Sequence, residues 1–405
     1  MPADKPLSNT TPENLVRRTG WPQSVSRAVV TPLQMSVVYA SDSPDQLDAQ
    51  YGGQVQGYTY AREGHPNASV LAAKIDALEV APLPGQGLIV GSGMAAVAAA
   101  VMGLLRAGDH VVAGVQLYGR SLRLLTQDMP RFGVTTTLAD PTDVGAIEAA
   151  LRPETRMILV EVVSNPTLRV ADMEGILALA KRRGVRVVVD NTFTTPRGYR
   201  PFDHGADIVL HSVTKMLAGH ADVTLGYVAT RDPADRKAIY DFATTTGLTP
   251  SPFDCWLAER GLHSFHLRYD RSEENARALA DHLVGLKGVK RVVYPTRPDH
   301  PDHNRAVALL GDRGGHMLSF EIAGGRAAAN ALTRAMPDIA FAPTLGDIGT
   351  TLSHPSSSSH RAVAEADRLA QGISEGFFRI SVGVEDIALL KRDFSAGLAA
   401  VTAAG

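Results

Sequence analysis

Short, almost entirely aliphatic segments alternate with helix-like segments in the first 230 residues of this chain. Strands this short and this apolar are typical of a parallel sheet that helices cover on both faces, because both sides of each strand are then buried. The pattern therefore predicts an α/β fold with a mainly parallel sheet. The expected strands are 88–90, 110–113, 157–160, 185–189 and 207–210, with 223–229 as a continuation, and the expected helices are 94–105, 122–132 and 176–183.

The pattern differs on either side of this region. Up to about residue 66 the chain is rich in turn formers and predicts an arm with little core of its own, after which Asn67 or Ser69 caps a helix. After about residue 252, strands and helices mixed with longer loops are typical of a smaller α+β domain. We therefore expect an arm at 1–66, a large domain at 67–252 and a small C-terminal domain at 253–405. The elements expected in the last are helices at 276–286, 327–336 and 387–401 and strands at 289–293, 317–322, 339–342 and 378–382.

The composition excludes several classes of function. Lys plus Arg (40) and Asp plus Glu (42) give a net charge of −2, so the chain lacks the basic excess of a nucleic-acid or anionic-membrane binder. A single cysteine, Cys255, excludes intramolecular disulfides and fits a reducing cytoplasm, where we expect the protein; we interpret it as a core residue. Residues 80–105 carry no charge, but prolines and glycines interrupt them, so a strand and a buried helix explain the run better than a membrane span.

Two histidine pairs, His263 with His266 and His300 with His303, have spacings that a metal site could use. Neither pair has a cysteine or a convergent acid beside it. We therefore interpret these histidines as surface residues and expect no metal site.

A glycine-rich turn, Gly91-Ser92-Gly93-Met94, joins the first strand to the helix that follows. It matches a dinucleotide fingerprint poorly, because the third glycine is missing and Asp109 precedes the next strand instead of ending it. The backbone amides of Gly93 and Met94 nevertheless lie at the positive end of a helix, where an anion can bind. On its own, the segment is explained equally well as a tight turn without a ligand.

Polar residues at two strand ends decide between these alternatives. Asp190 ends one predicted strand, and Ser212, Thr214 and Lys215 follow the next. Ligands of open α/β sheets bind at this carboxyl edge, and a desolvated lysine there has a lowered pKa and can act as a nucleophile. Pyridoxal 5′-phosphate (PLP) needs such a lysine, an acid for its pyridine nitrogen, phosphate donors and a ring to stack on, for which Tyr118 is available. Asp190 alone would more often cap a helix and Lys215 alone would more often be solvated, but together they predict a PLP site.

These motifs resemble the PLP-dependent trans-sulfuration (Cys/Met metabolism) enzymes of fold type I, over about residues 30–395. That family includes cystathionine γ-synthase, cystathionine γ- and β-lyases, methionine γ-lyase and O-acetylhomoserine sulfhydrylase. The resemblance implies an aspartate-aminotransferase-like fold. The matching stretches are YAREGHPN (60–67), SGMAA (92–96), YG (118–119), EVVSNP (161–166), DNTFTTP (190–196), GADIVLHSVTK (205–215) with GH (219–220), and RISVGVE (379–385).

The resemblance implies a role for each residue around the cofactor. Lys215 would bind PLP covalently and move protons between substrate carbons. Asp190 would keep the pyridine nitrogen protonated, and Tyr118 would stack on the ring and take part in proton transfer. The phosphate would be bound by Ser212, Thr214 and the amides of Gly93 and Met94.

The same resemblance implies a shared site and an amino-acid substrate. Family members complete the phosphate site with a Tyr-x-Arg motif from a neighbouring subunit, which matches Tyr60 and Arg62. This implies a homo-oligomer, namely a tetramer of two dimers that share active sites. Arg379 would bind the substrate α-carboxylate in a bidentate pair, with Asn165 and Thr344 alongside.

Several positions depart from the family pattern and bear on the substrate. Arg120 adds a cation after Tyr118-Gly119, and Arg123 matches a rim arginine of some relatives, although a solvated helix arginine explains it equally well. Thr59 and Pro343 stand where cystathionine-handling γ-enzymes carry glutamates. The loss of two carboxylates that would pair with the distal ammonium of cystathionine favours methionine, homocysteine or an O-acylated homoserine.

We therefore expect a PLP-dependent carbon–sulfur lyase or γ-replacement transferase that acts on a sulfur- or oxygen-substituted amino acid. The set of expected substrates also includes cystathionine. A β-lyase of the cystathionine β-lyase type is the closest alternative. An aminotransferase would share the fold and Lys215, although the stretches around 60–62 and 165–166 point away from it. A binding protein without chemistry would not need Lys215, Asp190, Tyr118 and Arg379 together.

Overall fold

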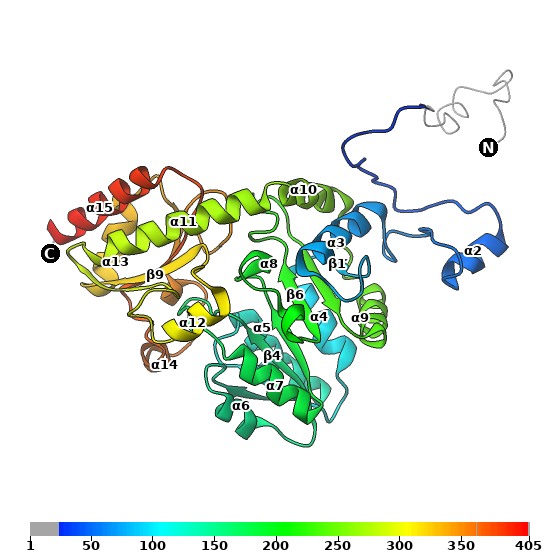
Figure 1. Cartoon of the computed structure of the whole chain (residues 1–405), viewed down its shortest axis with the longest axis horizontal. Coiled ribbons are helices and arrows are strands. Elements are labelled where there is room, and N and C mark those ends of the chain that lie inside the picture. Colours follow the sequence, from blue (N-terminus) through cyan, green and yellow to red (C-terminus); the bar gives the residue numbers. More distant parts are fainter. Residues whose placement is uncertain (1–23, 362, 404–405) are drawn as a thin grey trace. The chain divides into compact units, whose positions relative to one another are not determined.

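The computed structural model describes residues 24–361 and 363–403. Contacts divide the chain into two compact units, Met1–Pro32 and Leu33–Gly405. In the first unit, the described residues 24–32 form no helix or strand and leave Val25 and Val29 fully exposed. The second unit contains the two sheets (Figure 1). This division does not test the domain boundaries expected at 66 and 252, which stay predictions.

The larger sheet has seven strands in the order β1-β7-β6-β5-β4-β2-β3. The strands from β2 to β6 pair in parallel, whereas β7 is antiparallel to both β6 and β1, so the expected mainly parallel sheet is confirmed. The bounds are β1 (Leu88–Val90), β2 (His110–Gly114), β3 (Thr135–Ala139), β4 (Thr155–Glu161), β5 (Arg186–Asp190), β6 (Ile208–Ser212) and β7 (Gly226–Thr230).

Helices cover both faces of this sheet because successive residues of a strand point to opposite sides. In β5, Val188 belongs to the core with α4 (Gly93–Leu104) and α9 (Pro233–Thr246), while Val187 and Val189 belong to the core with α7 (Met173–Arg183). The strands are therefore apolar on both sides. The other helices of this region are α3 (Pro66–Glu79), α5 (Gly119–Arg123), α6 (Val144–Ala150), α8 (Thr195–Gly198) and α10 (Pro252–Leu262).

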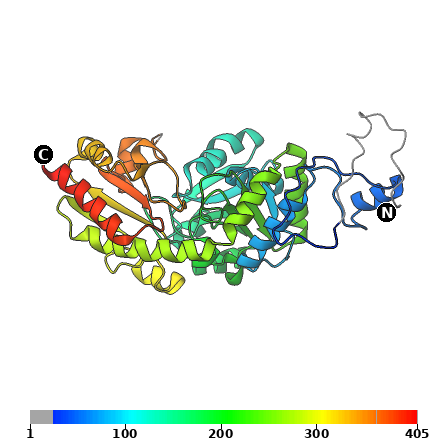
Figure 2. The ribbon, with the colours of Figure 1, turned by 90° about the horizontal axis from the view of Figure 1, so that it is seen from above.

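The smaller sheet has five strands in the order β10-β11-β12-β9-β8, and all but the β10–β11 pair are antiparallel. The strands β8, β9, β11 and β12 share a core with α11, α13 and α15, and these three helices lie together in Figure 2. This confirms a smaller α+β part. The bounds are β8 (Val289–Val293), β9 (Met317–Ile322), β10 (Ala340–Phe341), β11 (Thr351–Ser353), β12 (Phe377–Ser381), α11 (Phe265–Val284), α12 (His303–Leu310), α13 (Gly325–Ala335), α14 (Glu365–Ala370) and α15 (Ile387–Ala403).

Several elements differ from their predictions for identifiable reasons. The helix α11 begins at Phe265 instead of 276, because its first half buries polar residues such as Arg268 and Asn275, which hide the apolar periodicity. Within the arm expected to be irregular, α2 (Pro44–Tyr51) forms with a Ser43 cap. The cap of α3 is His65, whose side chain accepts from the amide of Ala68 at 3.2 Å, and is neither Asn67 nor Ser69. The helix expected at 122–132 is the end of α5 followed by a π turn and a 3₁₀ turn.

Three residue-level predictions have clear outcomes. None of the helices in the described ranges is long and apolar enough to cross a membrane, and the uncharged run forms β1 and α4. Cys255 is buried among apolar side chains, as expected of a core residue. The surface interpretation is wrong for His300, which is buried and whose Nδ1 accepts a hydrogen bond from the amide of Asp302 at 3.1 Å.

Candidate active site

The carboxyl ends of β4, β5 and β6 meet at one edge of the larger sheet. Glu161 pairs in register with Asp190, and Asp190 pairs with Leu210, two residues before Ser212. Because these strands are parallel neighbours, their last side chains lie close together. The structure thus brings the two predicted strand ends side by side.

Asp190 is half-buried at this edge, and its environment partly offsets the effect of burial on its carboxyl. Burial raises the pKa of the Asp190 carboxyl, while hydrogen bonds from Thr192 and the charge of His211 lower it. The amide of Thr192 donates to Asp190 Oδ1 at 3.1 Å, and Thr192 Oγ1 accepts from the amide of Ser212 at 2.7 Å. Thr192 therefore links β5 to β6 at the site, a role that the sequence analysis did not assign.

Glu161 is a second, half-buried carboxyl at this edge. The sequence analysis quoted it within a motif but gave it no role. Its Oε1 accepts a hydrogen bond from the amide of Tyr118 at 2.8 Å, and its Oε2 has no partner among the described residues. Burial and the charge of Asp190 raise the pKa of Glu161 well above its usual range. An acid that ends the strand next to Asp190 is the signal that could have identified it.

Lys215 lies in the turn after β6. The turn is closed by hydrogen bonds from the Lys215 amide to Ser212 O at 3.1 Å and from the Gly219 amide to Lys215 O at 2.8 Å. The buried guanidinium of Arg268 donates to the carbonyls of Met216 and Leu217, the two residues after the lysine. Sequence reasoning missed Arg268, which lies far along the chain in α11.

The amine of Lys215 points toward the smaller sheet. Its Nζ donates to Thr344 Oγ1 at 3.4 Å. Burial and the charge of Arg379 lower the pKa of Lys215. A lowered pKa increases the fraction of neutral, nucleophilic amine.

Arg379 is a buried cation in β12 that has no carboxylate among its hydrogen-bond partners in the described structure. Its Nη1 donates to Asn165 Oδ1 and its Nη2 to the carbonyl of Thr344, each at 2.6 Å. Its Nε has no partner, and burial lowers the pKa of Arg379 to about 10. The structure therefore brings Lys215, Thr344, Arg379 and Asn165 together.

The turn before α4 leaves two backbone amides free to bind an anion. Ser92 caps the helix by accepting from the amide of Ala95 at 3.0 Å, so the amides of Gly93 and Met94 point outward. A Cβ added to Gly93 would lie 2.6 Å from Cβ of Ser212, so this position requires glycine. Thr214 Oγ1, in contrast, already donates to the carbonyl of Leu225 at 3.2 Å and would have to release that bond to donate to a phosphate.

Tyr118 precedes the short helix α5, Arg120 lies within it and Arg123 ends it. Tyr118 is 44% exposed, so its ring is available for stacking. Arg120 is exposed, and the exposed Arg123 lies 3.9 Å from a carboxylate oxygen of Asp128. The solvated-helix interpretation therefore describes Arg123 in this structure.

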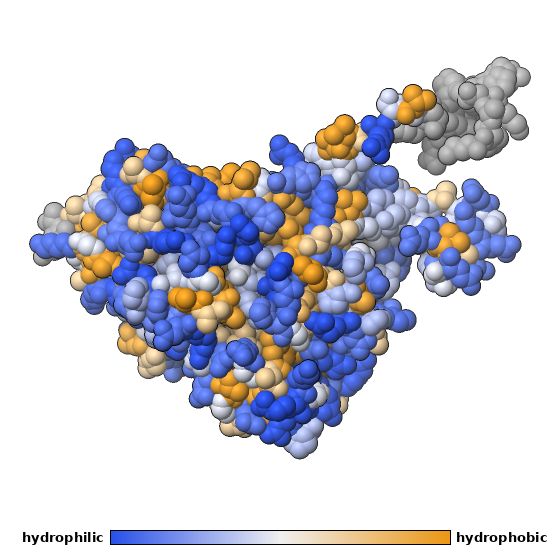
Figure 3. Space-filling model, viewed as in Figure 1, coloured by the Kyte–Doolittle hydropathy of each residue, from blue (hydrophilic) through white to orange (hydrophobic). Residues whose placement is uncertain are grey.

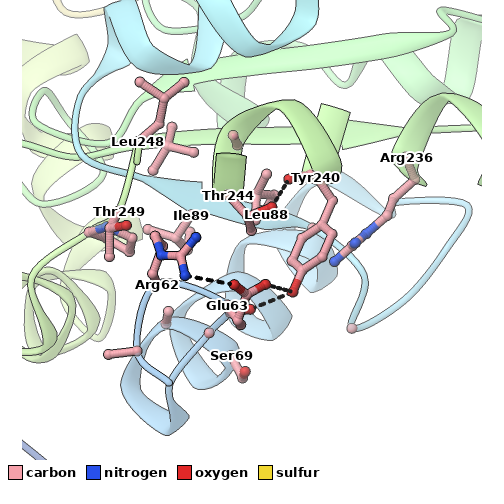
Figure 4. Close-up of a pocket in the computed structure, with 18 residues that line it drawn as sticks. Arg62, Glu63, Ser69, Leu88, Ile89, Arg236, Tyr240, Thr244, Leu248 and Thr249 are labelled. Carbon is pink, nitrogen blue, oxygen red and sulfur yellow. Dashed lines mark hydrogen bonds and ion pairs between the residues drawn. The ribbon is translucent and has the colours of Figure 1, made fainter. Parts of the chain in front are cut away.

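Tyr60 and Arg62 do not contact the residues described above. Arg62 lies 3.5 Å from Glu63, with its guanidinium 5.6 Å from the ring centre of Tyr60. It lines a separate small pocket of about 110 Å³, beside Glu63 and Tyr240 (Figure 4). One chain alone thus leaves the Tyr-x-Arg motif apart from Lys215.

The residues that the structure brings together fit the requirements of PLP. They supply an amine with a lowered pKa, a half-buried acid on the adjoining strand, free amides at a helix N-terminus and a half-exposed aromatic ring. The buried Arg379 with its unpaired Nε adds a group that an amino-acid carboxylate would satisfy.

Comparisons with known proteins agree with this geometry. The chain is 34% identical to L-methionine gamma-lyase of Porphyromonas gingivalis over 372 residues, which cover 91% of this chain and 92% of that protein. It is 36% identical to cystathionine beta-lyase MetC of Bacillus subtilis over 371 residues, 92% of each. These relatives act at different carbons, so similarity alone leaves the reaction open.

Two solved structures are also similar. Cystathionine gamma synthase of Xanthomonas oryzae, in complex with aminoacrylate and cysteine, is 35% identical with a TM-score of 0.87, and the match covers 93% of this chain and 94% of that chain. A putative O-acetylhomoserine (thiol)-lyase of Campylobacter jejuni with N′-pyridoxyl-lysine-5′-monophosphate is 25% identical with a TM-score of 0.88, covering 94% and 97%. The sequence model of the Cys/Met metabolism PLP-dependent enzymes matches residues 14–399. This chain therefore belongs to the family of Cys/Met metabolism PLP-dependent enzymes.

Proposed function

We propose that this trans-sulfuration enzyme removes or exchanges the γ-substituent of an amino acid whose side chain carries an uncharged thioether, thiol or ester. The observation that carries the proposal is the joining of Arg379 to Lys215 through Thr344, whose carbonyl and hydroxyl accept from the two side chains. An α-carboxylate bound by Arg379 would place the α-carbon of the substrate beside the amine of Lys215.

PLP, when bound, supplies an aldehyde for amino groups and a ring that accepts electrons from the substrate. Lys215 is assigned the covalent link and the movement of protons at the substrate carbons, which its lowered pKa supports. Asp190 would pair with the protonated ring nitrogen, and Tyr118 would stack on the ring. The phosphate would be bound by Ser212, Thr214 and the amides of Gly93 and Met94. Asn165 holds Arg379 in place for the carboxylate.

The charges around Lys215 support an uncharged substrate side chain. Within the described ranges, the carboxyls at this edge are Asp190, which accepts from Thr192, and Glu161, which accepts from Tyr118. Thr59 and Pro343 supply no charge. A distal ammonium such as that of cystathionine would lack the carboxylates that glutamates at positions 59 and 343 would supply, whereas the side chain of methionine, homocysteine or an O-acylhomoserine needs none.

The phosphate site is assigned to two subunits. Tyr60 is 41% exposed, and the ion pair and the ring contact of Arg62 are with Glu63 and Tyr60, not with Ser212 or Thr214. Apolar side chains are exposed along the preceding segment, including Met35 and Val38. Hydrophobic groups, drawn in orange, are scattered over the face shown in Figure 3. A second copy of the chain would bury them. We therefore propose a homo-oligomer of active-site-sharing dimers, assembled as a tetramer, and the single cysteine supports a cytoplasmic location.

A substrate panel tests the reaction. Methionine, homocysteine, cystathionine, cysteine and O-acylhomoserines are each supplied with and without a thiol acceptor, and the products are identified by mass. γ-Elimination releases a four-carbon keto acid with ammonia, γ-replacement gives a new thioether only with the acceptor, and β-elimination gives pyruvate. Pyruvate from cystathionine as the main product would replace the proposal by the β-lyase alternative, and amino transfer to a keto acid would replace it by transamination.

A further inference from the structure

The buried side chain of Arg268 in α11 binds the backbone of the turn after β6. Its Nη1 donates to the carbonyl of Met216 at 2.8 Å, and its Nη2 donates to the carbonyl of Leu217 at 3.0 Å. Nη2 also donates to the carbonyl of Gly261 at 3.0 Å, and Nε donates to Ser264 Oγ at 3.1 Å. Every nitrogen of this planar, rigid guanidinium therefore has at least one acceptor.

The hydrogen-bond partners of this cation are neutral. In the part of the chain that the structure describes, they are three carbonyls, one hydroxyl and the sulfur of Met216, and none is a carboxylate. A buried ion loses its hydration, and Arg268 is only 4% exposed. Within the same described ranges, no backbone amide donates to the carbonyls of Met216 and Leu217. The guanidinium thus supplies the hydrogen bonds that the turn itself leaves unmade.

The guanidinium occupies space that a glycine of the same turn leaves open. Gly219 has a φ of +76°, and a Cβ at this position would lie 1.8 Å from Nη1 of Arg268. The amide of Gly219 closes the turn by donating to the carbonyl of Lys215 at 2.8 Å. The turn and the arginine therefore fit together only because residue 219 has no side chain.

The loop between β10 and β11 lies against this turn as well. The amide of Ile348 in that loop donates to the carbonyl of Gly219 at 2.9 Å. Thr344, four residues earlier, accepts from Lys215 Nζ at 3.4 Å. The backbone that Arg268 binds thus carries the lysine and also contacts the loop that receives its amine.

We propose that Arg268 is a positioning residue for Lys215: by binding the carbonyls of the two residues that follow the lysine, it fixes the turn from which the amine reaches Thr344 and the substrate. The inference rests on the function proposed for Lys215, whose amine has to meet the aldehyde of PLP and the carbon atoms of the substrate. Misplacement of reacting groups by about 1 Å can slow a reaction about a hundredfold. Arg268 acts through the turn and is not itself a catalytic residue.

Arg268→Met tests the proposal, because methionine keeps an unbranched side chain but donates no hydrogen bond. PLP is added to the apoenzyme, total bound PLP is measured, and the visible absorbance follows formation of the covalent link. Borohydride then makes the link irreversible, and peptide masses give the fraction of bound PLP that is attached to Lys215. The groups proposed to bind the phosphate are unchanged, so PLP should still bind.

The rate of linking to Lys215 should nevertheless fall at least about tenfold in Arg268→Met, because the amine is no longer held in place. The kcat should fall by a similar factor. The KM of the substrate should change little, since Arg379 keeps its own partners Asn165 and Thr344.

Arg268→Lys is the second variant and decides the question if Arg268→Met does not fold. Lysine keeps the positive charge and can donate to a carbonyl, but its ammonium cannot reproduce the planar fork that binds two carbonyls at once. We therefore expect a rate of linking between those of the wild type and Arg268→Met, or below the wild type if only the lysine variant folds.

Asn275→Ala is the matched control, because Asn275 belongs to the same helix and is also buried. Its Nδ2 donates to the carbonyls of Gly383 and Glu385 at 3.0 and 2.8 Å, so the variant loses two comparable hydrogen bonds without touching the turn after β6. The melting temperature of each apoenzyme measures the loss of stability. Asn275→Ala should be destabilised but should link PLP to Lys215 at the wild-type rate.

The wild-type measurement separates failure of the inference from failure of the proposed function. If the reduced wild-type enzyme carries no PLP on Lys215, the proposed role of the lysine is wrong and the inference falls with it. If Lys215 is labelled but the folded Arg268 variants link PLP as the wild type does, the inference alone is wrong. It is also wrong if Asn275→Ala slows linking as much, or if folded Arg268→Met binds no PLP, because stability or the whole pocket would then explain the effect.

Discussion

Glu161 and Asp190 stand opposite each other in register on the parallel strands β4 and β5, where both strands end. Burial raises the pKa of both carboxyls, and the charge of Asp190 raises that of Glu161 further. Neighbouring carboxyls that cannot both ionise take different roles. Asp190, which has the hydrogen bonds of Thr192 and the charge of His211, is therefore the carboxyl that ionises more readily, and Glu161 is the one that holds its proton more strongly.

Glu161→Gln should therefore gain stability relative to the wild type as the pH rises. A carboxyl whose pKa is higher in the folded than in the unfolded state binds more protons when folded, so it loses stability as the pH rises above the unfolded pKa of about 4.3. Glutamine does not titrate and retains an oxygen to accept from Tyr118. Urea unfolding of both proteins at pH 5 and pH 8 measures the difference. Glu161→Ala is the contrast, since it leaves the amide of Tyr118 without its acceptor at both pH values. An equal stability difference between wild type and Glu161→Gln at the two pH values would show that Glu161 has an ordinary pKa.

The strand ends could be predicted from sequence. A parallel strand that is buried on both faces is a run of apolar residues, and the polar residue that follows the run marks the end of the strand. Asp190 and Lys215 are such residues, and the structure brings their strands side by side. Glu161 has the same signature, and only the absence of an obvious role kept it out of the predicted set. Of the helices expected in the larger part, those at 94–105 and 176–183 form as α4 and α7, whereas 122–132 does not form one continuous α-helix.

Contacts between distant segments could not be predicted in this way. Arg268 of α11 contacts the turn after Lys215, and Glu79 of α3 contacts His211. Both residues are buried, whereas a sequence pattern assigns polar residues like these to the surface. The hydroxyl of Thr214 matches a phosphate ligand by position, but in the folded chain it bonds to the backbone of Leu225. Such pairings depend on which faces meet, and local periodicity does not contain that information.

Gly93→Ala should weaken PLP binding more than it weakens the fold. The added methyl group would meet Ser212 at 2.6 Å, and overpacking of this kind costs about 1–3 kcal/mol. The displaced groups are those proposed to bind the phosphate, so the PLP dissociation constant should rise at least about tenfold, which corresponds to about 1.4 kcal/mol. Titration of the apoenzyme with PLP measures it. Gly285→Ala is the control, because a Cβ there meets nothing closer than 3.7 Å. PLP affinity unchanged in Gly93→Ala would remove this turn from the phosphate site.

Arg379→Ala should chiefly weaken substrate binding. Charged hydrogen bonds contribute about 1.5–3 kcal/mol, so kcat/KM should fall about ten- to hundredfold or more, mostly through KM. Arg379→Lys should not restore it, because an ammonium cannot reproduce the planar fork that now bonds to Asn165 and Thr344. Steady-state kinetics and PLP titration are measured together. Normal substrate saturation with intact PLP binding would contradict the carboxylate role, whereas loss of PLP binding would show that Arg379 supports the cofactor instead.

Arg62→Ala and Lys215→Ala should complement each other in mixed oligomers. If each site combines Lys215 of one subunit with Arg62 of another, a mixed dimer contains one intact site and one site that lacks both residues. Random reassembly of equal amounts then restores about a quarter of the wild-type sites, because half of the dimers are mixed and each has one intact site. Visible cofactor absorbance and turnover are followed after the two variants are unfolded and refolded together, with separately refolded variants combined afterwards as the control. A site built within one chain would give no activity above the control, since every subunit then lacks either its lysine or its arginine.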